Sequence, residues 1–150
     1  MPQLNGRTVK MELDTVKKNG TVRVCGDFKV TINPVLKAEQ YPLPRIEDIL
    51  SGGQQFTKVN LGEAYLQMEM QDDSKVFLTI NTLKGLYHYN RLVFGVASAS
   101  DIWQCAMDQV LQGVPGTQCY LDDIIETGAN DEEHLENLQK LLKRLEDYGL

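Results

Sequence analysis

The sequence predicts an α+β fold in which helices pack on one face of a mainly antiparallel sheet. Short segments alternate apolar and polar residues as strands do, and turn signals between them are short enough for hairpins. Two later stretches repeat apolar residues at helical spacing. The chain has 150 residues, of which 42% are hydrophobic and 24% are charged. This length and composition are typical of one folded domain with a sizeable core.

Five segments are predicted to be strands because their residues alternate in character. They are Thr21–Lys29, Gln55–Leu61, Gln67–Met70, Lys75–Ile80 and Gly85–Phe94. Asn19-Gly20, a hairpin-turn signal, precedes the first, and Asp72-Asp73 is expected in the turn between the third and the fourth. Phe56 and Lys58 are expected to share one face of the second strand.

The proline-rich stretch Tyr41-Pro42-Leu43-Pro44 is expected to be extended, because a residue that precedes proline is pushed out of helical space. Pro44 then suits the first turn of a short helix over Arg45–Leu50. Gly62–Leu66 is predicted to be a tight turn that leads into a short helical piece.

Two longer helices are predicted in the last third of the chain. The first has Ser100 as its cap, apolar positions from Ile102 to Leu111 and Gly113 as its stop. The second begins at Asn130, which opens a sequence like a capping box, and ends at Gly149. Its apolar stripe is too short for a zipper and is expected to pack on the sheet. The stripe contains Leu135, Leu138, Leu141, Leu142 and Leu145.

Between these helices, two adjacent carboxylates, Asp122 and Asp123, separate the apolar runs 118–121 and 124–125. Such a break is typical of the tip of a β-hairpin. Both acids would project at one end of the sheet, where ionised carboxylates repel each other unless a cation or solvent screens them. Alone, an Asp-Asp pair is more often a solvated turn than a metal site.

Charge is distributed unevenly along the chain, although the net charge is −6. Residues 1–50 carry eight Lys or Arg against six Asp or Glu, and residues 101–150 carry three against eleven. This asymmetry is compatible with a phosphate-binding face and a carboxylate-bearing face on one molecule. Three separated cysteines and two histidines make a zinc site improbable by composition and indicate reduced thiols. No signal peptide or membrane-spanning run is recognised, so an intracellular setting is expected.

Five motifs occur in a characteristic order. They are Val22–Lys29 followed by Asn33, Tyr41–Ile46, Tyr65-Leu66-Gln67, Phe94-Gly95, and Tyr120-Leu121-Asp122-Asp123. In this order they resemble the motifs of reverse transcriptases, most closely those of gypsy-type long-terminal-repeat retrotransposons and their retrovirus-like Pol polyproteins. The resemblance extends from about residue 9 to residue 150.

The resemblance implies the fingers and palm of a right-hand polymerase, with a ferredoxin-like palm sheet and no thumb. Residues 9–50 and 76–100 would be rich in fingers, and residues 51–75 and 101–150 rich in palm. The thumb and ribonuclease H regions would belong to a longer polyprotein, located in the cytoplasm or in a virus-like particle. The implied partners are an RNA or DNA template with its primer and deoxynucleoside triphosphates. The oligomeric state is left open.

The resemblance also implies roles for individual residues. Asp122, Asp123 and position 60 would hold two Mg²⁺ ions, or Mn²⁺ in their place, for nucleotidyl transfer to a primer 3′-hydroxyl. Tyr120 and Leu121 complete the active-site hairpin. Nucleotide-binding roles, for the triphosphate, the sugar and the nascent base pair, fall on Leu61, Gly62, Glu63, Ala64, Tyr65, Phe94, Gly95, Arg23 and Lys17, with Lys18 as a substitute for Lys17.

Residue 60 is asparagine, where the family has an aspartate that bridges the metals. An amide oxygen can contact one metal but brings no negative charge, so the protein supplies two carboxylates in place of three. We expect a substantial loss of metal binding and of transition-state stabilisation. Glu126 is a second departure, because it replaces an apolar strand residue where burial of a charge would be costly unless it reaches water.

Three functions are compatible with the sequence. The first is an RNA-directed DNA polymerase domain, which the motif set favours. The second is an inactive reverse-transcriptase-derived module that binds nucleic acid, which Asn60 favours. The third is an interaction module that binds no nucleic acid, which the acidic last third favours. Binding to an RNA–DNA hybrid that weakens as salt rises separates the second from the third, and nucleotide incorporation separates the first from both.

Overall fold

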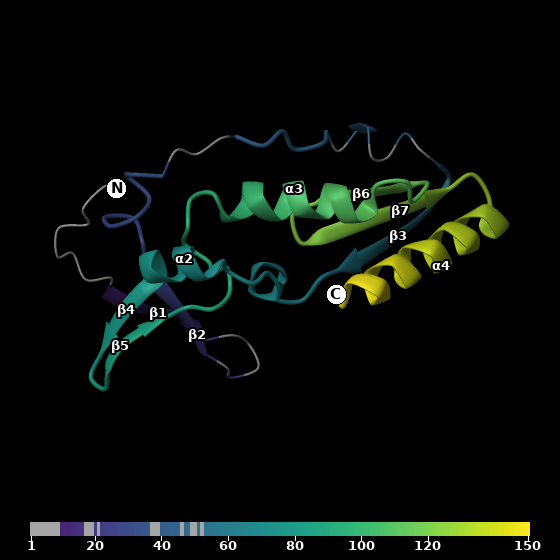
Figure 1. Ribbon diagram of the computed structural model, residues 1–150. Coiled ribbons are helices and arrows are strands. Elements are labelled where there is room, and N and C mark those ends of the chain that lie inside the picture. Colours follow the sequence, from purple (N-terminus) through teal and green to yellow (C-terminus); the bar gives the residue numbers. More distant parts are fainter. Residues whose placement is uncertain are drawn as a thin grey trace. The chain divides into compact units, whose positions relative to one another are not determined.

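The computed structural model describes residues 10–16, 20, 22–36, 40–45, 47–48, 51 and 53–150 (Figure 1). For residues 10–16 and 22–25 the description covers the backbone alone. The chain divides into two compact units, and each is described by itself. The first comprises Met1–Glu39 and Tyr65–Ala99, and the second comprises Gln40–Ala64 and Ser100–Leu150.

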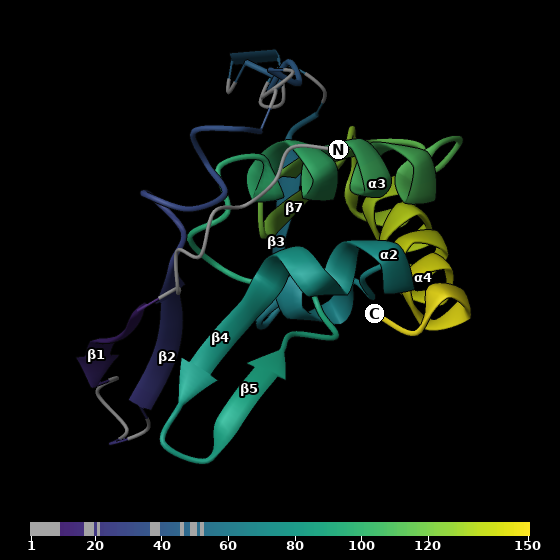
Figure 2. The ribbon, with the colours of Figure 1, turned by 60° about the vertical axis from the view of Figure 1, so that its left-hand side comes forward.

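The first unit contains two antiparallel hairpins, seen in Figure 2. Strand β1 (Lys10–Val16) pairs with β2 (Val22–Asp27), and β4 (Thr79–Thr82) pairs with β5 (Gly85–His88). Helix α2 (Asp72–Lys75) and the 3₁₀ turn η2 (Val76–Leu78) lead into β4. The core of this unit consists of the buried side chains Phe28, Ile32, Leu78, Ile80 and Val93.

Strand β1 was not predicted, although its residues Lys10–Asp14 alternate between polar and apolar side chains. The pairing of β1 with β2 shifts between Leu13 and Thr15. The extra residue at this point interrupts the alternation only after Asp14, so the signal in Lys10–Asp14 was present and was missed. Strand β5 is shorter than predicted, since it ends at His88 and not at Phe94.

The predicted turn at Asp72-Asp73 is wrong, because these two acids open helix α2. Negative charge is favourable in the first turn of a helix, and Lys75 Nζ lies 2.6 Å from Asp72 Oδ1 on the same helix. The predicted strand over Gln67–Met70 is also wrong. Residues 64–67 form the 3₁₀ turn η1 (Ala64–Gln67), and Glu69 forms only an isolated bridge with Arg91.

The second unit is built on a three-stranded antiparallel sheet in the order β3-β7-β6. Strand β3 (Gln55–Asn60) and strand β6 (Thr117–Tyr120) flank the central strand β7 (Asp123–Gly128). Two long helices complete the unit, α3 (Ala99–Leu111) and α4 (Asp131–Tyr148). Of the short helix predicted at Arg45–Leu50, the described residues Glu47 and Asp48 are helical, and Ile46, Ile49 and Leu50 lie outside the described part.

One face of this sheet, the covered face, carries buried side chains, and the other, the open face, carries exposed ones. This agrees with the prediction that helices pack on one face. Cys119 and Ile124 pair across β6 and β7, and both are almost fully buried. Their neighbours in sequence point the opposite way, and Gln118 is exposed. On β3, Phe56, Lys58 and Asn60 share the open face, as predicted for Phe56 and Lys58.

The ends of α4 agree with their predicted caps. The side chain of Asn130 accepts a hydrogen bond from the amide of Glu133, and Gly149 closes the helix in the left-handed conformation. Its apolar stripe is only partly covered, because Leu141 is fully buried while Leu135 and Leu142 are exposed. Helix α3 begins at Ala99, two residues earlier than a cap at Ser100 predicts, so Ser100 lies inside the helix and is not its cap.

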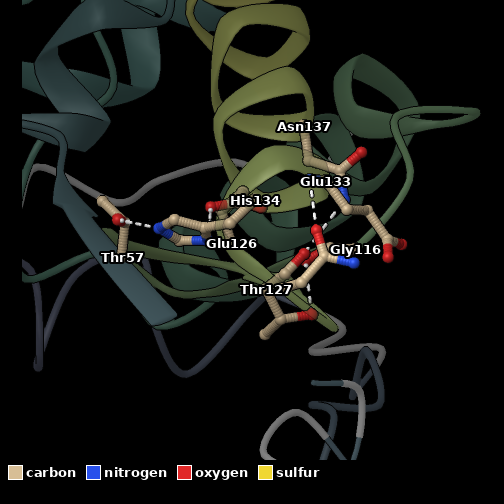
Figure 3. Close-up of polar contacts among 8 residues, drawn as sticks. Thr57, Gly116, Glu126, Thr127, Glu133, His134 and Asn137 are labelled. Carbon is tan, nitrogen blue, oxygen red and sulfur yellow. Dashed lines mark hydrogen bonds and ion pairs between the residues drawn. The ribbon is translucent and has the colours of Figure 1, made fainter. Parts of the chain in front are cut away.

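A buried carboxylate joins β7 to α4. Glu126 is 0% exposed, and its Oε2 lies 2.9 Å from Nδ1 of His134, while Nε2 of His134 lies 2.9 Å from the hydroxyl of Thr57 on β3. Figure 3 shows the His134 ring with Thr57 on one side and Glu126 on the other. The contact with Glu126, which is an ion pair only when His134 is protonated, lacks hydrogen-bond geometry, because neither carboxylate oxygen has a hydrogen-bond partner in the described structure. Glu126 therefore does not reach water.

Beside this ion pair, a second contact ties the same elements together. The buried amide of Asn137 on α4 donates to the carbonyl of Thr127, and the amide of Thr127 donates to the carbonyl of Gly116 (Figure 3). Gly128 permits the close approach of the helix, since a Cβ there would lie 2.5 Å from the backbone of His134. These contacts place the start of α4 directly against the end of β7.

We expect Glu126→Gln to stabilise the chain by up to about 1–3 kcal/mol as pH rises above the ordinary carboxyl pKa, because the buried carboxyl group has no hydrogen bond and its ionisation in the core is costly. Burial raises the pKa of Glu126, and the charge of His134 opposes this shift. The folded chain thus holds this proton more tightly than the unfolded chain does. The contribution of Glu126 to stability is complete below the ordinary carboxyl pKa and is lost as pH rises through the raised value.

Urea denaturation of both chains between pH 4 and pH 8 measures this effect, and the difference in free energy of unfolding should shrink toward pH 4. Glu136→Gln, at an exposed position of α4, is the matched control. The same comparison in a His134→Gln background removes the titration of the imidazole. A difference that stays constant with pH would contradict the assignment to Glu126.

Candidate active site

The two adjacent acids lie at the hairpin between β6 and β7, as the sequence predicted. Tyr120 pairs with Asp123, so the two-residue loop consists of Leu121 and Asp122. The loop is one residue earlier than the predicted Asp122-Asp123 tip, because Asp123 is already the first residue of β7. Asp122 is therefore exposed in the loop, whereas Asp123 is held in the sheet.

Residue 60 lies directly across the sheet from Asp123. The antiparallel register of β3 and β7 pairs Asn60 with Asp123 at the last position of β3. The Asn60 Nδ2 group donates a hydrogen bond of 2.8 Å to Asp123 Oδ1. An ionised carboxylate can only accept hydrogen bonds, so the amide presents its NH₂ group and not its oxygen to Asp123.

Lys58 contacts the other oxygen of the same carboxylate. Its Nζ lies 2.7 Å from Asp123 Oδ2, and the two side chains are 59% and 28% exposed. Hydrogen bonds from Lys58 and then from Asn60, with the charge of Lys58, lower the pKa of Asp123 against the opposing effect of burial. Asp123 is therefore ionised at neutral pH, and each of its oxygens has a donor of the protein beside it.

Helix α3 fixes the loop of this hairpin, a role that the motif analysis missed. Leu121 has a φ of 56°, a left-handed conformation that is strained for a leucine. The buried amide of Gln104 accepts from the Leu121 amide and donates to the carbonyl of Cys119, at 2.9 Å in both cases. Trp103 Nε1 and Cys119 Sγ both donate to the carbonyl of Leu121. The signal in the sequence was a glutamine at a buried helix position, which needs polar partners.

The turn after β3 is tied to the same hairpin. The amide of Leu61 donates a 2.8 Å hydrogen bond to the carbonyl of Asp122, and Leu61 and Ala64 are buried. Between them Gly62 and Glu63 are exposed, and Glu63 has a φ of 56°. The Leu61 amide is thus part of the scaffold of the site, whereas the resemblance implied that it contacts a triphosphate.

The remaining predicted residues belong to the first unit. Within it, the rings of Tyr65 and Phe94 contact each other, with centroids 5.1 Å apart. Asn33 clamps the loop that follows Phe94, since its side chain donates to the carbonyl of Gly95 and accepts from the amide of Ala97. Gly95 needs its glycine, because its φ is 92° and a Cβ would lie 3.0 Å from the Gly26 carbonyl oxygen.

The basic residues predicted for phosphate binding are less fully described. Arg23 lies in β2, where it pairs with Thr15, and its side chain is outside the described part of the structure. Lys17 and Lys18 lie outside the described residues altogether. Their roles stay predictions.

The donor set of the second unit does not fit a pair of divalent cations. Such a pair requires several carboxylate oxygens, and across from Asp123 the chain presents an amide NH₂ group and an ammonium. Within the described residues, no group of three or more His, Cys, Asp or Glu side chains is placed to hold a metal ion. We therefore derive no catalytic step through metal ions for this chain as it stands.

We expect Gln104→Leu to destabilise the chain by about 1–3 kcal/mol, because it leaves the Leu121 amide and the Cys119 carbonyl without their buried partner. Gln109→Leu, at an exposed position of the same helix, is the control and should change stability by less than about 0.5 kcal/mol. Denaturant unfolding of the two variants measures the difference. Equal stabilities would show that the Gln104 amide does not hold the hairpin.

The sequence of this chain matches a family model over most of its length. Residues 16–150 match the model described as "Reverse transcriptase (RNA-dependent DNA polymerase)". Among curated proteins, "Uncharacterized protein K02A2.6" of Caenorhabditis elegans is 40% identical over 139 residues, which cover 89% of this chain and 11% of that protein. The "Retrovirus-related Pol polyprotein from transposon 412" of Drosophila melanogaster is 32% identical over 79% of this chain and 10% of its own length.

Solved structures agree in fold. A foamy viral protease-reverse transcriptase in complex with double-stranded DNA has a TM-score of 0.77 at 20% identity, and the match covers 89% of this chain and 24% of that chain. The same viral protein in complex with an RNA/DNA hybrid has a TM-score of 0.69 at 20% identity, over 86% and 18% of the two chains. The chain spans about a tenth of the length of its curated relatives.

These matches confirm the mixed helix and antiparallel sheet architecture of a reverse transcriptase fingers and palm. The gypsy subtype stays a prediction. In the described part of the chain, no helix is long and apolar enough to cross a membrane. By the family match over residues 16–150, the chain belongs to the reverse transcriptase (RNA-dependent DNA polymerase) family.

Proposed function

We propose that this chain is the fingers-and-palm part of an RNA-directed DNA polymerase whose nucleotidyl-transfer site keeps its scaffold but has an impaired donor set. The observation that carries this proposal is the pairing of residue 60 with Asp123 across β3 and β7, beside the exposed Asp122. These are the three positions at which the family resemblance implies metal ligands. In this proposal the second unit is rich in palm and the first in fingers.

The proposed partner is a primer–template duplex. Two relatives by fold are described in complex with double-stranded DNA and with an RNA/DNA hybrid, which supports nucleic acid as the ligand class. The open face of the sheet, with Phe56, Lys58 and Asn60, is the proposed surface for the primer end. Helices α3 and α4 do not cover this face, and the two acids lie at its end. A 3′-hydroxyl placed on this face would therefore lie beside the acids.

The other residue roles in this proposal follow the resemblance. Backbone amides after Leu61 would hold the triphosphate, and the ring of Tyr65 would lie against the sugar and disfavour a 2′-hydroxyl. Its packing on Phe94 supports a fixed ring position. Arg23 and Lys17 would contact phosphates of the incoming deoxynucleoside triphosphate. Mg²⁺, or Mn²⁺ in its place, is the cofactor class that the family uses.

A second candidate function is an inactive module that binds nucleic acid. It is favoured by the hydrogen bond from Asn60 to Asp123, in which the residue at the position of the expected aspartate serves as a donor to the second acid. Such a module would keep the duplex-binding face and lack transfer of nucleotides. The two candidates differ only in the chemistry at residue 60.

We expect Asn60→Asp to raise primer extension on an RNA template by at least about tenfold, because a third carboxylate restores charge and a bridging ligand for divalent cations. Incorporation of a single deoxynucleotide is measured with Mg²⁺ and with Mn²⁺ for the parent and the variant. Asn81→Asp, at an exposed position of β4, adds the same charge elsewhere and should leave the rate unchanged. Equal activity of the parent and Asn60→Asp would show that Asn60 does not limit the chemistry.

We expect the chain to bind an RNA–DNA hybrid with an affinity that falls as salt rises, because phosphate contacts release condensed counterions. Fluorescence anisotropy at several salt concentrations gives the slope of log affinity against log salt. The net charge of −6 makes this a demanding test, since the overall charge of the chain repels the phosphate backbone. A lack of binding at low salt would leave only the interaction module that binds no nucleic acid.

A further inference from the structure

We infer that the ammonium group of Lys58 is a built-in competitor for divalent cations at Asp123. Lys58 is a positioning residue in this inference, and a metal ion that binds Asp123 must first displace it. The inference rests on the proposed function only in treating Asp123 as a potential metal ligand. It goes beyond the loss of charge at residue 60, because it assigns an opposing role to a different side chain.

The geometry of the contact is the first argument. Asp123 has two carboxylate oxygens, and each one is already within hydrogen-bonding distance of a donor from β3. Oδ1 accepts from Asn60 Nδ2 at 2.8 Å, and Oδ2 lies 2.7 Å from Lys58 Nζ. A cation at 2.0–2.6 Å from either oxygen would occupy the space in which these donors lie.

The second argument is that the strand itself directs Lys58 to this place. Lys58 and Asn60 are two residues apart on β3, so both point to the open face of the sheet. Asn60 is directly opposite Asp123, and Lys58 is its diagonal neighbour, opposite Ile125. A diagonal neighbour in an antiparallel pair is within reach of a long side chain. The contact thus follows from the register of the sheet.

The third argument concerns charge. The two acids of the hairpin, Asp122 and Asp123, carry two negative charges, and Lys58 reduces the local net charge to one. With aspartate at residue 60, three carboxylates would leave a net charge of two beside the same lysine. Attraction of a divalent ion falls with each unit of charge removed at close range. In this chain Lys58 therefore halves the net negative charge of the two hairpin acids.

The effect is expected in cation binding and not in folding. Lys58 is 59% exposed, and ion pairs between exposed groups contribute at most about 1 kcal/mol to stability. A divalent ion, however, competes directly with the ammonium for one oxygen. Removal of the ammonium should therefore change metal affinity while the fold stays intact.

The test uses Mn²⁺ alone, with the full chain and without nucleic acid, and electron paramagnetic resonance to count free Mn²⁺. We expect Lys58→Met to bind Mn²⁺ at least about threefold more tightly than the parent at low ionic strength. The matched control is Lys140→Met. Lys140 has a comparable exposure of 54% and pairs with Glu136 at 3.5 Å on α4, so its loss changes the net charge equally. Its Mn²⁺ affinity should stay that of the parent.

Two more variants separate the charge from the shape of the side chain. Lys58→Gln keeps a polar chain without charge and should behave as Lys58→Met does. Lys58→Arg keeps the charge and should return the affinity to that of the parent. Equal Mn²⁺ binding by Lys58→Met and Lys140→Met, or no Mn²⁺ binding by Lys58→Met, would overturn the inference.

The outcome is independent of polymerase activity. Tighter Mn²⁺ binding by Lys58→Met supports the inference even if Asn60→Asp incorporates no nucleotide, in which case the proposed function fails alone. Conversely, restored incorporation by Asn60→Asp together with unchanged Mn²⁺ binding by Lys58→Met would retain the proposed function and refute the role of Lys58.

Discussion

The antiparallel pairing of β3 with β7 is the constraint on which the candidate site depends. It brings Asn60 and Asp123, which are 63 positions apart in the sequence, to directly opposite places at the end of the sheet. The same register puts Lys58 on the diagonal. Because side chains alternate between faces, a shift of one residue between β3 and β7 would put Lys58 and Asn60 on the face opposite to Asp123. The chemistry of the site is therefore set by strand register.

The covered face of the sheet maintains this register. The Gln104 amide accepts from Leu121 and donates to Cys119 and to Asp108, and the strain at Leu121 is offset by hydrogen bonds to both its backbone groups. On the same side of the sheet, Glu126 is buried against His134 without a hydrogen bond. The first contact stabilises the loop beside the acids, whereas the second leaves the buried carboxyl group of Glu126 without a hydrogen bond. The covered face thus contains one polar group whose hydrogen bonds are satisfied, the Gln104 amide, and one whose burial is costly, the Glu126 carboxyl group.

Local patterns predicted the second unit well and the first unit less well. Three short-range signals of the second unit agree with the structure: the cap at Asn130, the stop at Gly149 and the alternation in β3. In the first unit, β1 was missed although Lys10–Asp14 alternates, and its register with β2 shifts only between Leu13 and Thr15. The sequence Asp72-Asp73 is compatible both with a turn and with the start of a helix. In the structure it begins α2, in which Asp72 forms an ion pair with Lys75.

The sequence alone determined the family, the hairpin that carries the two acids and the departure at residue 60, because these depend on residue identity in a short order. The tertiary structure decided what surrounds them. Two contacts of Asp123 depend on strand pairing: the hydrogen bond from the Asn60 amide to one carboxylate oxygen, and the contact of Lys58 with the other. The paired strands are distant in the sequence. Composition and local periodicity contain no information about which strands become neighbours. A contact of this kind exists only once the sheet has formed.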